Sequence, residues 1–232
     1  CAISRSNEAK ALGIPMGAPA FKYERVFRKN NVEVFSSNFP LYGDMSNRVM
    51  SILSKFSPNI EIYSIDEAFL KFEGFENYDL ESYCQNIKDI VFKWTGIPIS
   101  IGIAPTKALA KVSNRIAKKF PNQTEGVYLI NSEEKRIKAL KWLKIEDVWG
   151  IGFRHSKRLK NNKVNTAHDF ILSPDNWVRK NMSVVGVRLK KELEGNSVLG
   201  LEEVRSTKKA IATTRSLEGT ITDYEKIKQR IS

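Results

Sequence analysis

The sequence has little cysteine and no long apolar run, and both absences narrow the classes of protein it can belong to. Its two cysteines are Cys1 and Cys84, which leaves no pairs for a disulfide framework and no cysteine spacing typical of a metal site. The cytoplasm is therefore the expected compartment. No apolar stretch approaches the ~20 residues that cross a bilayer, so we expect no membrane-spanning segment.

Several catalytic signatures are also missing. The sequence contains no nucleophile elbow, no Walker A lysine and no dinucleotide-binding fingerprint, which argues against hydrolases and P-loop enzymes. The two histidines, His155 and His168, have no cysteine or carboxylate at metal-ligand spacing, and neither is predicted to be catalytic.

The excess of positive charge is unevenly distributed along the chain. The formal net charge is +12, from 38 Lys and Arg against 26 Asp and Glu. Residues 1–100 are nearly balanced, whereas basic residues gather after residue 106 and again over 135–163 and 179–191. This clustering favours a polyanionic partner, although charge alone does not separate a nucleic acid from an acidic lipid surface or from a merely soluble basic face.

Two adjacent carboxylates, Asp66 and Glu67, interrupt an otherwise apolar segment. The segment IEIYSIDEAFLKF, residues 60–72, predicts a buried strand or a strand, turn and strand. A buried carboxylate needs a cationic partner, and Mg²⁺ is the leading candidate because it prefers carboxylate oxygens. The alternative is a solvated turn beside one of the many lysines.

Helical and strand-like segments alternate up to residue 131. Apolar periodicity predicts helices over 7–12, 45–56, 80–94 and 107–120, and strands over 97–104 and 126–130 in addition to the carboxylate segment. After residue 12, Gly and Pro predict turns. The alternation indicates an α+β fold, in which a sheet carries helices on one face. After residue 131 the composition becomes helical and basic, which indicates a second domain.

The turn Val148-Trp149-Gly150-Ile151-Gly152 resembles a helix-hairpin-helix motif. Gly150 and Gly152 leave backbone N–H groups accessible at the start of a helix, where a phosphate is favoured. The nearby basic residues Arg154, Lys157 and Arg158 would strengthen a grip on the DNA backbone. An ordinary tight loop is the alternative, and a weaker second copy covers 182–194.

Basic residues also follow one face of the helix over 107–120. Lys107, Lys111, Arg115 and Lys118 are separated by steps of four, four and three, which places them in one stripe. Such a stripe is either a solvated face or a surface for nucleic acid or triphosphate. Under the second interpretation, Lys107 and Lys111 are candidate DNA-binding residues.

Four separated motifs together resemble the Y-family translesion DNA polymerases. They are NEAKALGIPMG at 7–17, SIDEAFL at 64–70, GIAPTKALAK at 102–111 and VWGIG at 148–152. EAKALGIPMG and FSSNFPLYGDMSNRVM resemble more narrowly the UmuC type, the catalytic subunits of bacterial DNA polymerase V. The resemblance covers essentially the whole chain, and it implies an error-prone, DNA-directed DNA polymerase of SOS DNA repair in the bacterial cytoplasm.

The resemblance also implies roles for individual residues. Asp66 and Glu67 would be catalytic and would bind the two Mg²⁺ ions of the complete enzyme. Lys118 and Lys10 would contact the triphosphate of the incoming dNTP, Lys10 in place of an arginine. Asn7 stands where many relatives have a tyrosine that touches the same group.

By the same resemblance, the chain divides into a small finger lobe (1–38), a polymerase palm with an antiparallel or mixed sheet (39–131), an all-helical thumb containing the helix-hairpin-helix (132–201), and a linker with the start of the little finger (202–232). The family's first palm strand, with a further metal-binding aspartate and an aromatic gate, is expected before Cys1, and most of the little finger after Ser232. We therefore expect the isolated chain to be inactive.

The implied partners are primer-template DNA, dNTP, the processed SOS mutagenesis accessory protein (UmuD-type), the recombinase filament and the sliding clamp. Two other functions stay open. A non-catalytic helix-hairpin-helix DNA-binding module would use the Gly150 turn alone. A nucleotidyl cyclase with a similar palm would need no thumb.

Overall fold

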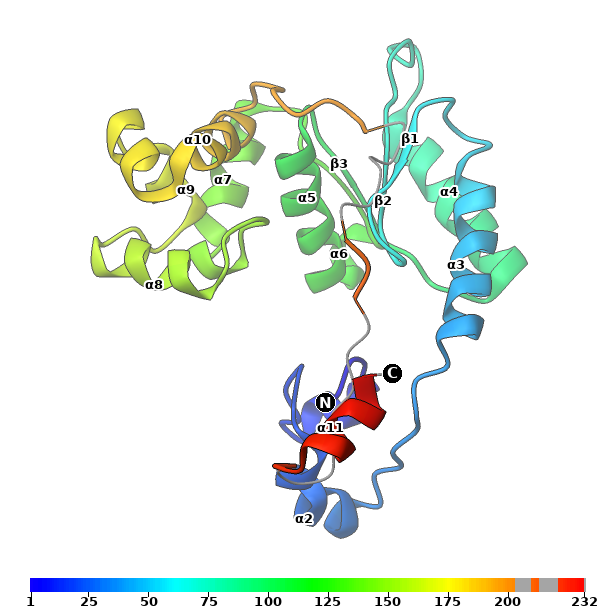
Figure 1. The fold of residues 1–232 in the computed structure, drawn as a ribbon. Helices are drawn as coiled ribbons and strands as arrows, with labels where there is room; N and C mark the ends of the chain where they lie inside the picture. Colours follow the sequence, from blue (N-terminus) through cyan, green and yellow to red (C-terminus); the bar gives the residue numbers. More distant parts are fainter. Residues whose placement is uncertain (203–209, 213–220, 232) are drawn as a thin grey trace.

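The computed structural model describes residues 1–202, 210–212 and 221–231, and most of the predicted linker over 202–232 lies outside these ranges. Figure 1 shows three groups of elements: α1 and α2 near the N-terminus, the strands with α3 to α6, and α7 to α10. The last described helix is α11 (Tyr224–Ile231). Within the described ranges, no helix is both long enough and apolar enough to cross a membrane.

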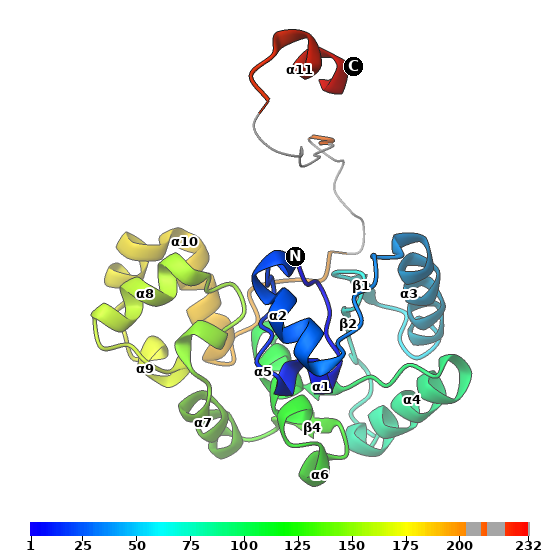
Figure 2. The same ribbon diagram turned by 90° about the horizontal axis from the view of Figure 1, so that it is seen from below.

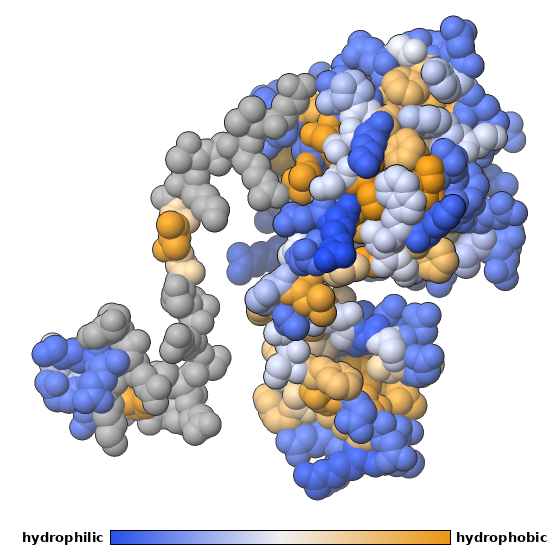
Figure 3. Space-filling view, turned by 90° about the vertical axis from the view of Figure 1, so that its right-hand side faces the viewer, coloured by the Kyte–Doolittle hydropathy of each residue, from blue (hydrophilic) through white to orange (hydrophobic). Residues whose placement is uncertain are grey.

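The N-terminal lobe contains α1 (Asn7–Ala11) and α2 (Ala20–Asn30), which lie next to each other in Figure 2. The helix predicted over 7–12 is confirmed, and so are the turns after it, which lie at residues 12–13 and 16–17. Helix α2, which covers 11 residues, was not predicted. The sequence signal for α2 was weak, since this helix buries none of its residues and Pro19 before it offers no side-chain cap. The lobe is visible at the bottom of Figure 3, joined to the rest by a narrow connection.

The strands and the helices that pack on them follow the order expected from the sequence. The helices are α3 (Phe39–Leu53), α4 (Leu80–Thr95), α5 (Lys107–Lys119) and α6 (Pro121–Thr124). The strands are β1 (Ile60–Ile62), β2 (Ala68–Leu70), β3 (Ile101–Ile103) and β4 (Val127–Leu129). The mixed α+β architecture is therefore confirmed.

Among the described residues the strands form two separate pairs instead of one sheet. β1 pairs with β2 antiparallel, and β3 pairs with β4 parallel. The carboxylates Asp66 and Glu67 lie in the turn between β1 and β2, so the prediction of a continuous buried strand is wrong and its alternative of a strand, turn and strand is confirmed.

Helices cover both faces of the β3–β4 pair, which corrects the expectation of one covered face. Ile103 and Val127 pack with the core cluster that contains the fully buried Cys84 of α4. Gly102 faces α5 instead, and a Cβ on it would lie 2.1 Å from the backbone nitrogen of Asn114. Helix α5 can approach this closely only because residue 102 has no side chain. Burial raises the pKa of the Cys84 thiol to about 12, so it stays a small apolar core residue.

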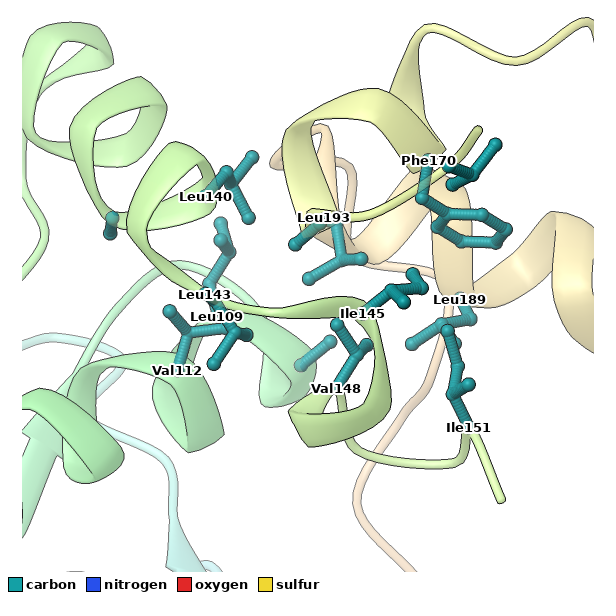
Figure 4. Close-up of a cluster of buried hydrophobic side chains, with 14 of the residues drawn as sticks. Leu109, Val112, Leu140, Leu143, Ile145, Val148, Ile151, Phe170, Leu189 and Leu193 are labelled. Carbon is teal, nitrogen blue, oxygen red and sulfur yellow. The ribbon is translucent and has the colours of Figure 1, made fainter. Parts of the chain in front are cut away.

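The second half of the described chain is helical. Its elements are α7 (Glu133–Trp142), the short 3₁₀ helix η1 (Ile145–Asp147), α8 (Phe153–Asn161), α9 (Ala167–Ile171) and α10 (Asp175–Leu193). Figure 4 shows that Leu109 and Val112 of α5 belong to the same buried cluster as Leu140, Phe170 and Leu193. One face of α5 is thus core for the helical half while the helix also packs on β3 and β4.

Glu192 ties the two halves together at the start of α5. Its side chain is fully buried, and its Oε2 accepts a hydrogen bond from the backbone N–H of Ala108 at 3.2 Å. Its Oε1 accepts from the N–H groups of Val198 at 2.7 Å and Leu199 at 2.9 Å. A carboxylate is favoured there because the first N–H groups of a helix lack partners within the helix.

We predict that Glu192→Gln destabilises the protein by about 1–3 kcal/mol, because an amide nitrogen would then oppose one of the three N–H groups that now donate to the buried carboxylate. Urea unfolding followed by circular dichroism measures the loss. Glu134→Gln on the exposed surface of α7 is the matched control and should change the free energy of unfolding by less than about 0.5 kcal/mol. Equal stability of Glu192→Gln and the wild type would contradict the role given to this carboxylate.

Candidate active site

The turn between β1 and β2 presents the two carboxylates at the surface of a cleft. The backbone N–H groups of Tyr63 and Ser64 both donate to the carbonyl of Glu67 at 3.0 Å, which closes the turn. The Ser64 hydroxyl donates to Oδ1 of Asp66 at 2.6 Å and so orients that carboxylate. Asp66 is exposed and Glu67 is half-buried, and both side chains line the cleft.

The cleft has a volume of about 1750 Å³ and extends between β2 and β3. Its walls come from β2, β3, α3, α5 and the segment over 194–201. Three residues of the predicted basic stripe line it together with the carboxylates: Lys107, Lys111 and Lys118. The structure therefore brings the carboxylate motif and the basic helix into one site. This proximity could not be read from the order of the two motifs along the chain.

Most of the basic stripe is already paired with carboxylates. Lys111 Nζ makes an ion pair with Glu67 Oε1. Lys107 Nζ lies 2.5 Å from Glu61 Oε2 and donates to the carbonyl of Gly200 at 2.9 Å.

Farther along α5, Arg115 lies 2.5 Å from Asp147 of η1. Lys118 is exposed and pairs with no carboxylate in the described part of the chain. The stripe is thus neither a solvated face nor wholly free for a ligand, and Lys118 is its member with an available charge in the cleft.

Lys10 is not brought into this group. It lies on α1, is exposed, and its Nζ donates to Oδ1 of Asn7 at 3.2 Å. Ile3 and Ser4 of the same lobe line the cleft, whereas Lys10 does not.

The second predicted site, the glycine turn, lies in the helical half. Gly150 has a φ of +83°, a conformation that favours glycine, and Gly152 is the residue that precedes the first turn of α8. Arg154 and Lys157 on α8 are exposed and pair with no carboxylate in the described ranges. Arg158 is used differently, because its Nη1 donates to the carbonyl of Asn181 at 2.6 Å and braces α8 against α10.

Sequence reasoning missed the residues that join these two turns. The indole Nε1 of Trp149, directly before Gly150, donates to the hydroxyl of Tyr63 at 3.1 Å. Glu61 was missed as well, although it is buried and forms an ion pair with Lys107. In the sequence, Tyr63, Trp149 and Glu61 stand out only as aromatic or acidic residues next to the motifs. Their partners could not be identified, because they lie far away along the chain.

The two carboxylates fit part of a site for a hard divalent cation. Carboxylate oxygens are the side-chain ligands that Mg²⁺ prefers, and both carboxylates face the cleft. The described residues contain no group of three or more potential metal-binding side chains. Asp66 and Glu67 therefore supply a partial shell, to which further oxygens must be added by other groups.

Comparison with known proteins assigns this part of the chain to a family. Residues 1–115 match the family model described as the impB/mucB/samB family. They form a domain of the impB/mucB/samB family. The residues matched include the carboxylate turn and most of α5, so they contain both Glu67 and its partner Lys111, whereas Lys118 lies just beyond them.

Individual relatives extend the similarity beyond the impB/mucB/samB domain. The chain is 43% identical to protein UmuC of Salmonella typhimurium over 233 residues, a match that covers 100% of this chain and 55% of that protein. It is 34% identical to DNA polymerase IV of Picrophilus torridus over 169 residues, covering 72% of this chain and 46% of that one. The resemblance to UmuC-type members of the Y family is confirmed, and the chain spans about half the length of these relatives.

Solved structures agree with this assignment. A DinB family error-prone DNA polymerase from Sulfolobus solfataricus has a TM-score of 0.70 and 27% identity, over 88% of this chain and 60% of that one. An insertion ternary complex of the Dbh DNA polymerase has a TM-score of 0.69 and 28% identity, over 85% of this chain and 56% of that one.

We predict that Lys111→Met strengthens divalent-cation binding at Glu67, because it removes a positive charge that competes for the same carboxylate. The Coulomb term between nearby charges in water is about 1 kcal/mol, so the affinity should rise about fivefold. Titration with Mn²⁺ followed by electron paramagnetic resonance measures it. Lys119→Met, at the exposed end of α5, should leave the affinity unchanged. A weaker affinity in Lys111→Met would show that Lys111 orients Glu67 for the metal instead.

Proposed function

We propose that the chain is part of an error-prone translesion DNA polymerase that adds deoxynucleotides to a primer opposite damaged template. The observation that carries the proposal is the cleft that brings Asp66 and Glu67 together with Lys111 and Lys118. Carboxylates opposite lysines suit a reaction between a cation-bound triphosphate and a hydroxyl. The names of the relatives, protein UmuC and DNA polymerase IV, support the same reaction.

Asp66 and Glu67 would hold the Mg²⁺ ions of this reaction. When bound, paired Mg²⁺ ions stabilise the entering and leaving oxygens of an in-line phosphoryl transfer. The Ser64 hydroxyl would keep the Asp66 carboxylate turned toward the cleft through its 2.6 Å hydrogen bond. The further aspartate expected on a palm strand before residue 1 would complete the shell.

Lys118 would contact the triphosphate of the incoming dNTP, since its charge is available in the cleft. Lys10 is proposed for the same group, which requires the N-terminal lobe to bring α1 toward the cleft. The segment between α2 and α3, residues 31–38, has no regular secondary structure and would permit this movement. Lys107 and Lys111, proposed as DNA-binding residues, would have to exchange a carboxylate for a phosphate.

The glycine turn at 150–152 is proposed as a helix-hairpin-helix grip on the DNA backbone. Gly152 leads into α8, whose first N–H groups have no acceptor within the helix. The exposed Arg154 and Lys157 lie in the first two turns of the same helix. In this proposal 1–38 is the finger lobe, 39–131 the palm and 132–201 the thumb.

The proposed partners follow from the same function. Primer-template DNA and dNTP are the substrates, and the processed UmuD-type accessory protein, the recombinase filament and the sliding clamp would bring the polymerase to damaged DNA in the bacterial cytoplasm. One of the structural relatives is an insertion ternary complex of a DNA polymerase, which supports the DNA and nucleotide part of this proposal.

The catalytic assignment is tested by primer extension past an abasic site with the full-length protein and Mg²⁺. Asp66→Ala and Glu67→Ala should each lower the extension rate by more than about a hundredfold, since loss of an outer-shell partner alone costs 10- to 100-fold. Asp89→Ala, an exposed acid of α4 that does not line the cleft, is the control and should keep the wild-type rate. Extension at the wild-type rate by Asp66→Ala and Glu67→Ala would refute the assignment.

The alternative function, a non-catalytic DNA-binding module, is favoured by the glycine turn alone and predicts a different pattern. If the turn grips phosphates, Arg154→Ala and Lys157→Ala should each weaken duplex binding and reduce the slope of log K against log salt by about 1. Fluorescence anisotropy at several salt concentrations measures the slope, with Lys141→Ala of α7 as control. Unchanged slopes would show that the turn does not bind DNA phosphates. Reduced slopes in a protein that extends no primer, with DNA binding unaffected by Asp66→Ala, would favour the module.

A further inference from the structure

Three aromatic rings connect the carboxylate turn to the glycine turn. Tyr63 directly precedes the turn that holds Asp66 and Glu67, and Phe69 follows it on β2. Trp149 comes from the helical half and directly precedes Gly150. Ring centroids lie 5.7 Å apart for Tyr63 and Trp149, 5.8 Å for Tyr63 and Phe69, and 5.9 Å for Phe69 and Trp149. Each ring therefore contacts the other two.

A hydrogen bond fixes the relative orientation of the Tyr63 and Trp149 rings. Trp149 Nε1 donates to the Tyr63 hydroxyl at 3.1 Å, between residues 86 positions apart in the chain. The Tyr63 and Trp149 rings meet edge to face at an interplanar angle of 77°, an arrangement that aromatic pairs prefer. Sliding the helical half along the strands would break the hydrogen bond and the ring geometry together.

Each end of the contact is attached to one of the two proposed sites. The backbone N–H of Tyr63 donates to the carbonyl of Glu67 at 3.0 Å, so a movement of Tyr63 moves the carboxylate turn. Trp149 packs against the buried core cluster of the helical half and is covalently joined to Gly150. The three rings therefore form a direct contact between the segments that carry the two turns.

Two lysines of α5 also contact these rings. Lys111 Nζ, the partner of Glu67, lies 5.8 Å from the centroid of the Tyr63 ring. Lys107 Nζ lies 5.1 Å from the centroid of the Phe69 ring. The aromatic contact and the ion pair of Glu67 therefore share Lys111, and a shift of one disturbs the other.

We propose that Tyr63 and Trp149 are positioning residues that fix the distance between the glycine turn and the carboxylate turn. The inference rests on the proposed function: a primer held by its phosphates at Gly150 needs its 3′-hydroxyl at Asp66 and Glu67. A misplacement of about 1 Å between reacting groups costs about a hundredfold in rate. The aromatic contact supplies this alignment without touching the reacting atoms.

The sharpest variant is Tyr63→Phe in the full-length protein, because it keeps the ring contacts and removes only the hydrogen-bond acceptor. We expect kcat for primer extension to fall about tenfold, while the Kd for primer-template DNA and the KM for dNTP change less than about twofold. Trp149→Phe should lower kcat similarly, and the double variant should match the single ones because both remove the same bond. Trp177→Phe, a tryptophan packed on the same core but not in contact with Tyr63 or Phe69, should behave as the wild type.

A second measurement needs no polymerase activity and therefore separates failure of this inference from failure of the proposed function. In the wild type, binding of a short blunt duplex at the glycine turn should slow amide hydrogen exchange of residues 60–70. In Tyr63→Phe this effect should fall at least about fivefold, while protection over 148–158 persists.

Three results would overturn the inference. The first is unchanged kcat in Tyr63→Phe, and the second is equal protection of residues 60–70 in wild type and variant. The third is a loss of DNA affinity at constant kcat in Trp149→Phe, which would show that Trp149 contacts DNA instead. If the wild type extends no primer, the proposed function fails and the exchange measurement alone decides whether the two turns are coupled.

Discussion

The buried carboxylate of Glu192 is the interaction on which the arrangement of the cleft depends. It accepts hydrogen bonds at the start of α5 and from residues 198 and 199, while its own backbone carbonyl accepts from the hydroxyl of Thr106 at 2.7 Å. A buried charge with this many donors is stable only when every donor stays in place. The end of α10, the start of α5 and the segment after α10 are therefore held as one unit.

Because α5 is fixed at its first turn, its basic residues act at defined positions along the cleft. Lys107 reaches Glu61 on β1, Lys111 reaches Glu67 in the carboxylate turn, and Arg115 reaches Asp147 in the helical half. The Lys107–Glu61 pair is nearly buried, with side chains 12% and 8% exposed, so loss of either partner would leave an uncompensated charge. Helix α5 thus sets the spacing between the strand pairs and the helices that follow.

The local features of the fold could be predicted from the sequence because they depend on neighbouring residues. Thr106 caps α5 and Gly96 ends α4 in the left-handed conformation, as the capping preferences of these residues indicate. The turn with Asp66 and Glu67 was recognised from its apolar flanks. Its exposure agrees with the alternative of a solvated turn beside a lysine, because β1 and β2 cover only three residues each and leave the turn outside the core.

Long-range features were not predictable for a physical reason. The partner of Glu67 is 44 residues away, and the partner of Tyr63 is 86 residues away. Neither pairing follows from periodicity, since each depends on how α5 and η1 pack after the elements have formed. The role of Gly102 was hidden for the same reason, because a glycine in a short strand indicates a close approach but not which element approaches.

In the proposed polymerase, the weak packing of the N-terminal lobe would permit tolerance of a damaged template. Over residues 1–38 only Ile14 and Ala18 are buried, whereas Phe21 and Phe35 are 72% and 86% exposed. A lobe with so little core is held by few contacts, and it has little free energy available to reject a distorted base pair pressed against it. Selection of the nucleotide would then rest on the template and on Lys118 in the cleft. The ion pairs of α5 lie elsewhere, with the strands and the helical half. In the proposed function these contacts would align the primer with the carboxylates whatever the template base is.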